Sequence, residues 1–179
     1  RLVHEPLPLA RVVGAAAEGD RRLLLAMTES ARRCDLASVP AADRRDALLG
    51  VAADLDANAE EWARLLVDEI AKPISWARAE VARCAVTFRL SADAVVDFSQ
   101  EVAVDPGTDA RTGYRLGLRR RPVGTVYAVV PWNWPLNLTA HKIAPAIAAG
   151  CPTVLKASPV APLATLRLAA VLNSFLPPG

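Results

Sequence analysis

The stretch that decides the fold covers residues 123–156 and reads VGTVYAVVPWNWPLNLTAHKIAPAIAAGCPTVLK. Residues 123–130 form an almost unbroken apolar, β-favouring run, which predicts a strand buried on both faces, as parallel strands are. Asn137 can cap a helix after this strand, and Gly150 stands where a left-handed C-terminal cap favours a residue without a Cβ. Residues 153–155 predict a second short strand.

A second helix completes a β-α-β-α order. Pro162 suits its first turn, and its predicted buried face is formed by Ala164, Leu168, Val171, Leu172 and Phe175. Crossovers between parallel strands are almost always right-handed, so the carboxyl ends of both strands meet at one edge of the sheet, where ligands bind. Residues 131–135 and 156–159 form the loops that follow those ends. The sequence therefore predicts a ligand site at these two loops.

Three polar side chains near this edge can carry chemistry. Asn133 is held in a stiff loop between two prolines, where its amide could donate to a developing oxyanion or only satisfy the loop's own backbone. Lys156 ends the second strand, where it could meet a ribose hydroxyl or phosphate, or only extend into solvent. Lys142, inside the apolar helix, could move protons, although solvation of its charge is the simpler interpretation.

The first half of the chain predicts helices after an irregular lead-in over residues 1–20. A first helix is expected over about residues 21–34. After Pro40, a second helix should bury one face, which is formed by Leu48, Val51, Ala52 and Leu55.

A third helix is expected to begin at Asn58, whose side chain can accept from a free amide of the first turn while Glu61 reaches back. Lys72 and Pro73 end this helix, because proline disfavours helical geometry in the residue before it. A longer helix begins near Ser75. Its predicted buried side consists of Val81, Cys84, Ala85, Phe88, Ala92, Val95 and Val96.

The period of the pattern changes after Phe98. The sequence Asp-Pro-Gly at residues 105–107 suits a type II turn, and residues 114–118 then alternate as in a strand with one wet face. We therefore expect an antiparallel hairpin. The arginines at 119–121 favour a charged strand face or edge over a nucleic-acid patch, since no aromatic residues are interleaved with them.

The composition excludes several classes of protein. The 179 residues are 53% hydrophobic and carry 21 basic and 19 acidic side chains, a net charge of +2, which excludes extensive disorder and a strong field for nucleic acid. The apolar stretches are short and interrupted, so no membrane span is expected.

Cys34, Cys84 and Cys151 are widely spaced and odd in number, so neither a metal site nor a disulfide framework is predicted. No signal peptide opens the chain, which favours a cytoplasmic protein, and the first residue, Arg1, suggests part of a longer one.

Several ordered motifs closely resemble the N-terminal half of the aldehyde dehydrogenase superfamily. They are Val123-Gly124, Pro131-Trp132-Asn133-Trp134-Pro135-Leu136, His141-Lys142-Ile143-Ala144-Pro145-Ala146, Ala149-Gly150, Val154-Leu155-Lys156 and Leu176-Pro177-Pro178-Gly179. Upstream, Glu69-Ile70-Ala71-Lys72-Pro73 is similar to the family's E-x-G-K-P segment, with alanine in place of the glycine. The match covers about residues 21–179 in the family's order.

The resemblance implies oxidation of an aldehyde to an acid, with NAD or NADP as the cofactor, through a thiohemiacetal and a thioester. Asn133 would be the side-chain half of the oxyanion hole, and Lys142 a proton-relay candidate. The implied cofactor-binding positions are Val130, Pro131 and Trp132 on the ribose and nicotinamide side, and Lys156, Ser158 and Pro159 at the adenosine ribose.

The resemblance also implies the architecture, which is α/β. Residues 1–98 would form the N-terminal helices of the cofactor-binding domain, and residues 99–121 an antiparallel oligomerisation-arm hairpin. Residues 122–179 would form the first β-α-β-α unit of an incomplete parallel, Rossmann-like sheet. The expected partners are a small-molecule aldehyde and further copies of the chain in a dimer or tetramer, with no nucleic acid or membrane.

The sequence departs from the family's pattern at informative places. Pro159 stands where many NAD-preferring members have a glutamate that bonds the ribose hydroxyls, so the choice between NAD and NADP stays open. The nucleophilic cysteine and general-base glutamate would lie beyond Gly179. Cys151 is a poor substitute, because it follows the C-terminal end of a helix. We therefore expect this segment alone to be inactive. The alternatives are a non-catalytic truncated paralogue that acts as a scaffold or oligomer partner, and an arginine-rich nucleic-acid binder.

Overall fold

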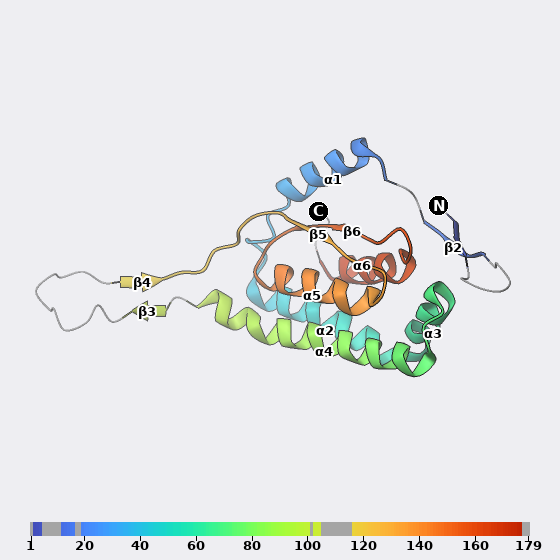
Figure 1. The fold of residues 1–179 in the computed structure, drawn as a ribbon. Helices are drawn as coiled ribbons and strands as arrows, with labels where there is room; N and C mark the ends of the chain where they lie inside the picture. The colour runs from blue at the N-terminus through green and yellow to red at the C-terminus, as the bar shows by residue number, and fades with distance from the viewer. Residues whose placement is uncertain (1, 5–11, 17–18, 101, 105–115, 177–179) are drawn as a thin grey trace, which may run out of the picture.

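The computed structural model describes residues 2–4, 12–16, 19–100, 102–104 and 116–176 (Figure 1). The elements, in chain order, are β1 (Leu2–His4), β2 (Val12–Ala15), α1 (Arg21–Arg33), α2 (Ala41–Ala57), α3 (Ala59–Ile70), α4 (Ile74–Ser99), β3 (Val102–Val104), β4 (Leu116–Leu118), β5 (Val126–Val129), α5 (Pro135–Ala148), β6 (Thr153–Lys156) and α6 (Leu163–Phe175). The chain is therefore an α/β protein in which helices carry most of the described residues.

Strands β5 and β6 pair in parallel, with Val126 opposite Thr153 and Val129 opposite Lys156. This confirms the predicted order of a strand, a crossover helix and a parallel strand. Gly150, with φ +77°, closes the crossover helix in the left-handed conformation that the sequence predicted. The loops after β5 and β6 consequently leave the sheet at the same edge.

The expectation that both faces of β5 are buried is wrong for the described structure. Ala128 is buried, but Tyr127 and Val129 on the other face are 51% and 50% exposed. Helix α5 packs against both strands from one side, whereas α1 on the other side contacts β6. The apolar run predicted the strand but not its covering, because covering depends on which elements pack against it.

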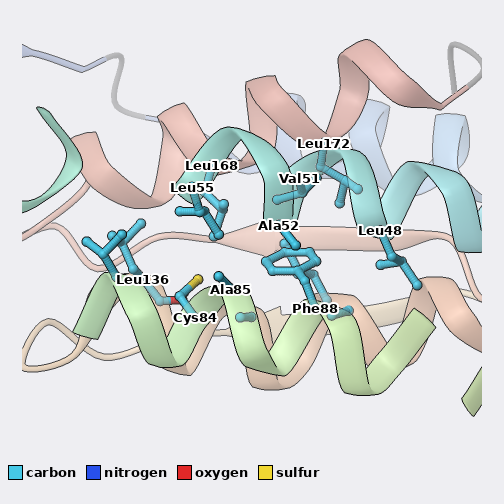
Figure 2. Packing of buried hydrophobic residues seen from close by; sticks show 14 of the residues in the cluster. Leu48, Val51, Ala52, Leu55, Cys84, Ala85, Phe88, Leu136, Leu168 and Leu172 are labelled. Carbon is cyan, nitrogen blue, oxygen red and sulfur yellow. The ribbon is translucent and has the colours of Figure 1, made fainter. Parts of the chain in front are cut away.

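The helices form the main core. Helix α4 lies along α2 and α5, and α6 packs on α2 and α5, so α5 and α6 lie between the strands and the outer helices (Figure 1). Figure 2 shows the side chains that meet there: Leu48, Val51, Ala52 and Leu55 of α2; Cys84, Ala85 and Phe88 of α4; Leu136 of α5; and Leu168 and Leu172 of α6. The predicted helical faces are confirmed except at Val96 and Phe175, which are about half exposed.

Asn58 does not cap α3 with its side chain, contrary to the prediction. Helix α2 ends only one residue earlier, so Asn58 also closes α2 with φ −112° and ψ 25°, and its Nδ2 donates to Oδ1 of Asp54 at 2.9 Å. The other carboxylate oxygen of Asp54 accepts from Nε1 of the buried Trp62 at 3.0 Å. Glu61 pairs with Arg167 of α6 instead of completing a capping box.

Two antiparallel strand pairs flank the helical body. Strands β3 and β4 pair with Val102 opposite Leu118, and they project away from the helices (Figure 1). The Asp-Pro-Gly turn predicted between them lies outside the described residues. Strands β1 and β2 also pair, with a register shift after Val3, where the sequence predicted only an irregular lead-in. No helix of the described residues is long and apolar enough to cross a membrane.

Ala71 joins α3 to α4 in a strained conformation. Its φ of 52° and ψ of 34° lie in the left-handed region, where a Cβ approaches the backbone too closely, and no other non-glycine residue of the described chain has a positive φ. The similar family segment has glycine here. Residue 71 therefore adopts the left-handed conformation although alanine disfavours it.

Ala71→Gly should raise the free energy of unfolding by about 1 kcal/mol, because the left-handed strain of roughly 1–2 kcal/mol exceeds the entropy that glycine adds to the unfolded chain. Urea unfolding followed by circular dichroism measures this change. The matched control is Ala79→Gly at an exposed site inside α4, which should lower the free energy of unfolding by about 1 kcal/mol. A loss of stability in both variants would contradict the assignment of strain to Ala71.

Candidate functional site

The loops at the carboxyl edge of the β5–β6 pair form the candidate site. The ladder extends one residue beyond the strands, because the N–H of Val130 donates to the carbonyl of Lys156 at 3.2 Å. Asn133 lies in the loop after β5, and its side chain has no hydrogen-bond partner among the described residues. The role of this amide as an oxyanion donor stays a prediction.

Helix α5 begins at Pro135, so Asn137, which the sequence predicted as its cap, lies inside the first turn. Proline fits this first position because it has no N–H to satisfy and its φ is already helical. The cap comes from α4: Oε1 of Glu80 accepts from the N–H groups of Leu136 at 2.9 Å and Asn137 at 3.1 Å. Glu80 is fully buried, so a carboxylate from a neighbouring helix satisfies the start of α5.

Lys72 holds the same loop from a second direction. Its Nζ forms an ion pair with Oε2 of Glu80 and donates to the carbonyl of Asn133 at 2.8 Å. The ammonium also lies 4.2 Å from the ring centre of Trp134, within cation–π range, and that ring meets Trp76 edge-on at 6.1 Å. The loop between β5 and α5 is thus fixed by a buried cation, a buried carboxylate and two aromatic rings.

Glu69 performs the corresponding task at the second loop. Its carboxylate accepts from the N–H of Leu163 and, at 3.1 Å, from that of Ala164, which are the first two residues of α6. Burial raises the pKa of the Glu69 carboxyl above its ordinary value of 4.5, and the two backbone donors offset this only in part. The helix after β6 is therefore also capped by a buried carboxylate from elsewhere in the chain.

One short segment contacts both loops. Glu69, next to last in α3, caps α6, whereas Lys72, three residues later, reaches the loop after β5. The sequence identified this segment only as a similarity to a family motif and did not predict these contacts. A signal was present, since Glu80 lies four residues before Cys84 and eight before Phe88, on the stripe predicted to be buried.

The predicted cofactor positions on the first loop differ in exposure. Val130 is buried, while Pro131 and Trp132 are exposed, with Trp132 at 53%. An exposed aromatic face beside the edge of the sheet is available for contact with a ring or sugar.

The positions on the second loop differ in the same way. Lys156 is exposed, and its Nζ donates to the carbonyl of Ala157 at 3.3 Å. Ser158 is buried, and its Oγ accepts from the N–H of Val160 at 3.2 Å, so the hydroxyl serves the turn itself. Pro159 is exposed. Lys156 is therefore the charged side chain that this loop presents to solvent.

Lys142 lies on the exposed side of α5, next to His141. Neither an ion pair nor a hydrogen bond joins its ammonium to any described residue, so the structure does not connect it to Asn133. The role of Lys142 as a proton-relay candidate stays a prediction.

A groove of about 840 Å³ opens between α4 and α5 and reaches the Asn133 loop at Trp134. Its lining is largely apolar, with Val86, Leu90 and Phe98 on α4, and polar side chains enter it at Arg83 and His141. The groove gives an organic molecule room beside the loop.

Two of the three cysteines are poorly accessible as nucleophiles. Cys84 and Cys151 are buried, and burial strongly raises the pKa of the Cys84 thiol, whereas Cys34 is partly exposed. The described part of the chain also holds no group of three His, Cys, Asp or Glu side chains that could bind a metal ion. What the edge offers chemically is one free amide, one exposed ammonium and a rigid frame.

Comparison with known proteins gives one consistent result. A family model described as "Aldehyde dehydrogenase family" matches residues 3–179. Lactaldehyde dehydrogenase of Methanocaldococcus jannaschii is 40% identical over 139 residues, which are 78% of this chain and 29% of that protein. The NADP/NAD-dependent aldehyde dehydrogenase PuuC of Escherichia coli (strain K12) is 36% identical over 176 residues, 96% of this chain and 34% of that protein.

A solved structure agrees with these relatives. The crystal structure of glyceraldehyde-3-phosphate dehydrogenase GapN from Methanocaldococcus jannaschii, complexed with NADP, matches with a TM-score of 0.85 and 34% identity. The match covers 93% of this chain and 36% of that one. The present chain thus spans about a third of the length of the relatives it matches.

Glu80→Ala should lower the free energy of unfolding by about 3–5 kcal/mol, because it removes the cap of α5 and leaves the buried Lys72 ammonium unpaired. Urea unfolding measures the loss. The control is Glu61→Ala, which breaks an exposed ion pair with Arg167 and should change the stability little. Equal effects of the two substitutions would show that Glu80 is not the anchor described here.

Glu69→Gln should remove a pH dependence of stability. The folded state binds the Glu69 proton more tightly than the unfolded chain, so the wild-type stability due to this group is fully present below pH 4.5 and is lost as the pH rises through the raised pKa. The difference in unfolding free energy between the wild type and Glu69→Gln should therefore fall as the pH rises above 4.5. A wild type that instead gains stability over the variant as the pH rises would contradict this sign.

Proposed function

The chain belongs to the aldehyde dehydrogenase family, and we propose that it forms part of an enzyme that oxidises an aldehyde to a carboxylic acid with NAD or NADP. This segment supplies the oxyanion donor and part of the cofactor site. The observation that supports the proposal best is the free amide of Asn133, placed at the carboxyl edge of a parallel strand pair and held by Lys72 and Glu80.

Asn133 has the properties of an oxyanion donor. When a thiolate adds to an aldehyde, negative charge develops on the former carbonyl oxygen, and an N–H group already aimed at that oxygen stabilises it with little reorganisation. The side-chain amide of Asn133 makes no hydrogen bond to a described residue, while its backbone is anchored. Its Nδ2 can therefore donate without first breaking another bond.

The cofactor side of the edge fits a dinucleotide in part. Lys156 presents an ammonium that can donate to ribose hydroxyls or a phosphate, and Val130, Pro131 and Trp132 provide an apolar border. When bound, the nicotinamide ring supplies the hydride acceptor for the oxidation. Pro159 has no side-chain acceptor for a ribose hydroxyl and no negative charge that would repel a phosphate on the ribose. This position is therefore compatible with either NAD or NADP.

The remaining parts of the chain take the roles that the family resemblance assigns. Residues 1–98 contribute the helices that hold the loops, and residues 122–179 begin the Rossmann-like sheet. The β3–β4 pair within residues 99–121 serves as an arm for a homo-oligomer, a role supported by its projection from the body and by the exposure of Val102 and Leu118 (Figure 1). The enzyme acts in the cytoplasm.

Asn133→Ala tests the proposal in the protein expressed from its complete gene. We expect kcat to fall about 100- to 1,000-fold with KM little changed, because the lost donor acts on charge that develops only in the transition state. NAD(P)H formation with a panel of small aldehydes is the measurement. Asn173→Ala, at an exposed position on α6, is the matched control and should leave kcat unchanged. A wild type that oxidises no aldehyde, or an Asn133→Ala variant with normal kcat, would refute the assignment.

A further inference from the structure

We propose that Lys72 is a positioning residue, which acts on the reaction by fixing the peptide that carries the oxyanion donor Asn133. The inference rests on the proposed function, since it assumes that the amide of Asn133 meets the developing oxyanion. It assigns a second residue to the reaction, 61 positions earlier in the sequence, which acts through its contact with the loop.

The groups around Lys72 confine its ammonium to one position. Its side chain is 8% exposed, and the three groups around Nζ are the buried carboxylate of Glu80, the carbonyl of Asn133 and the ring of Trp134. Each group attracts a cation, so together they hold the ammonium against the loop. A lysine that merely neutralised Glu80 would not need the other two contacts.

The loop has few other ways to hold its shape. Pro131 and Pro135 have no N–H groups, so neither can donate a backbone hydrogen bond. The neighbouring bonds lie at the two ends, from Val130 to Lys156 and from Leu138 to the carbonyl of Trp134. The bond from Lys72 is the contact at Asn133 itself, and fixing that carbonyl fixes the peptide plane next to the Cα from which the amide extends.

Small displacements of such a donor have large effects. A shift of about 1 Å in a catalytic group can reduce a rate about 100-fold. Loss of the Lys72 contact should therefore lower kcat through Asn133, while KM stays nearly unchanged. This separates a positioning role from a general loss of folded protein.

A double-mutant cycle in the protein expressed from its complete gene provides the test. Lys72→Met keeps the length of the side chain and removes its charge, and it should lower kcat about 10- to 100-fold with KM changed less than about threefold. In the Asn133→Ala background the same substitution should lower kcat by less than about twofold, because Lys72 would then have no donor to position. Arg64→Met on the exposed surface of α3 is the control and should leave kcat unchanged.

A second variant covers the case in which Lys72→Met does not fold. Lys72→Met combined with Glu80→Gln leaves no unpaired buried charge, and the glutamine oxygen can still accept from the N–H groups that start α5. The same fold-changes are expected of this pair, with and without Asn133→Ala.

The possible results separate the two proposals. Normal kcat in the Lys72 variants, or equal losses with and without Asn133, would overturn the positioning role while leaving the proposed function standing, provided that Asn133→Ala alone is slow. Normal kcat in Asn133→Ala, or a wild type without activity, would overturn the proposed function and this inference together.

Discussion

Two helices start inside the protein at the edge of the β5–β6 pair, and each leaves backbone N–H groups that water cannot reach. An unpaired buried donor costs about 1–3 kcal/mol of stability. A fold in which two helices begin in the interior therefore needs acceptors next to their first N–H groups. Glu80 supplies them to α5 and Glu69 to α6, both from helices that precede the sheet in the chain. The position of both loops of the candidate site depends on these two carboxylates, because the loops end where the capped helices begin.

This arrangement also determines what the edge can bind. In many dinucleotide-binding folds the pyrophosphate rests on the free N–H groups at the start of a helix, next to a glycine-rich turn. Here those groups on α5 and α6 already donate to Glu80 and Glu69, and a phosphate placed there would meet a carboxylate. The absence of a G-x-G-x-x-G sequence agrees with this, since no close approach of phosphate to either turn is needed. At this edge of the described chain, Lys156 presents an exposed ammonium.

Periodicity in the sequence predicted what depends on local pattern. The buried faces of α2 and α4, the left-handed Gly150 and the parallel order of β5 and β6 all follow from spacing and from the handedness of crossovers. The caps were predicted poorly, because the Asn58 side chain bonds Asp54 of the preceding helix and the start of α5 is served by Glu80 of α4. The burial of Tyr127 was predicted wrongly, because no local pattern states which elements cover a strand. The sequence named Asn133 as a candidate from its loop alone. Lys72 and Glu80 make their contacts across 61 and 56 residues, and no local rule connects such pairs.

The turn at Ala71 explains how one short segment serves both loops. A left-handed residue reverses the chain between α3 and α4, so that Glu69 before it faces α6 and Lys72 after it faces the loop of Asn133. An ordinary helical or extended residue at position 71 would turn one of the two side chains away from its partner. The strain at Ala71 is therefore retained by contacts on both sides of it, and these contacts lie in the helical layer. The geometry of the candidate site is thus set by residues that precede the β5–β6 sheet, and the loops of that sheet carry Asn133 and Lys156.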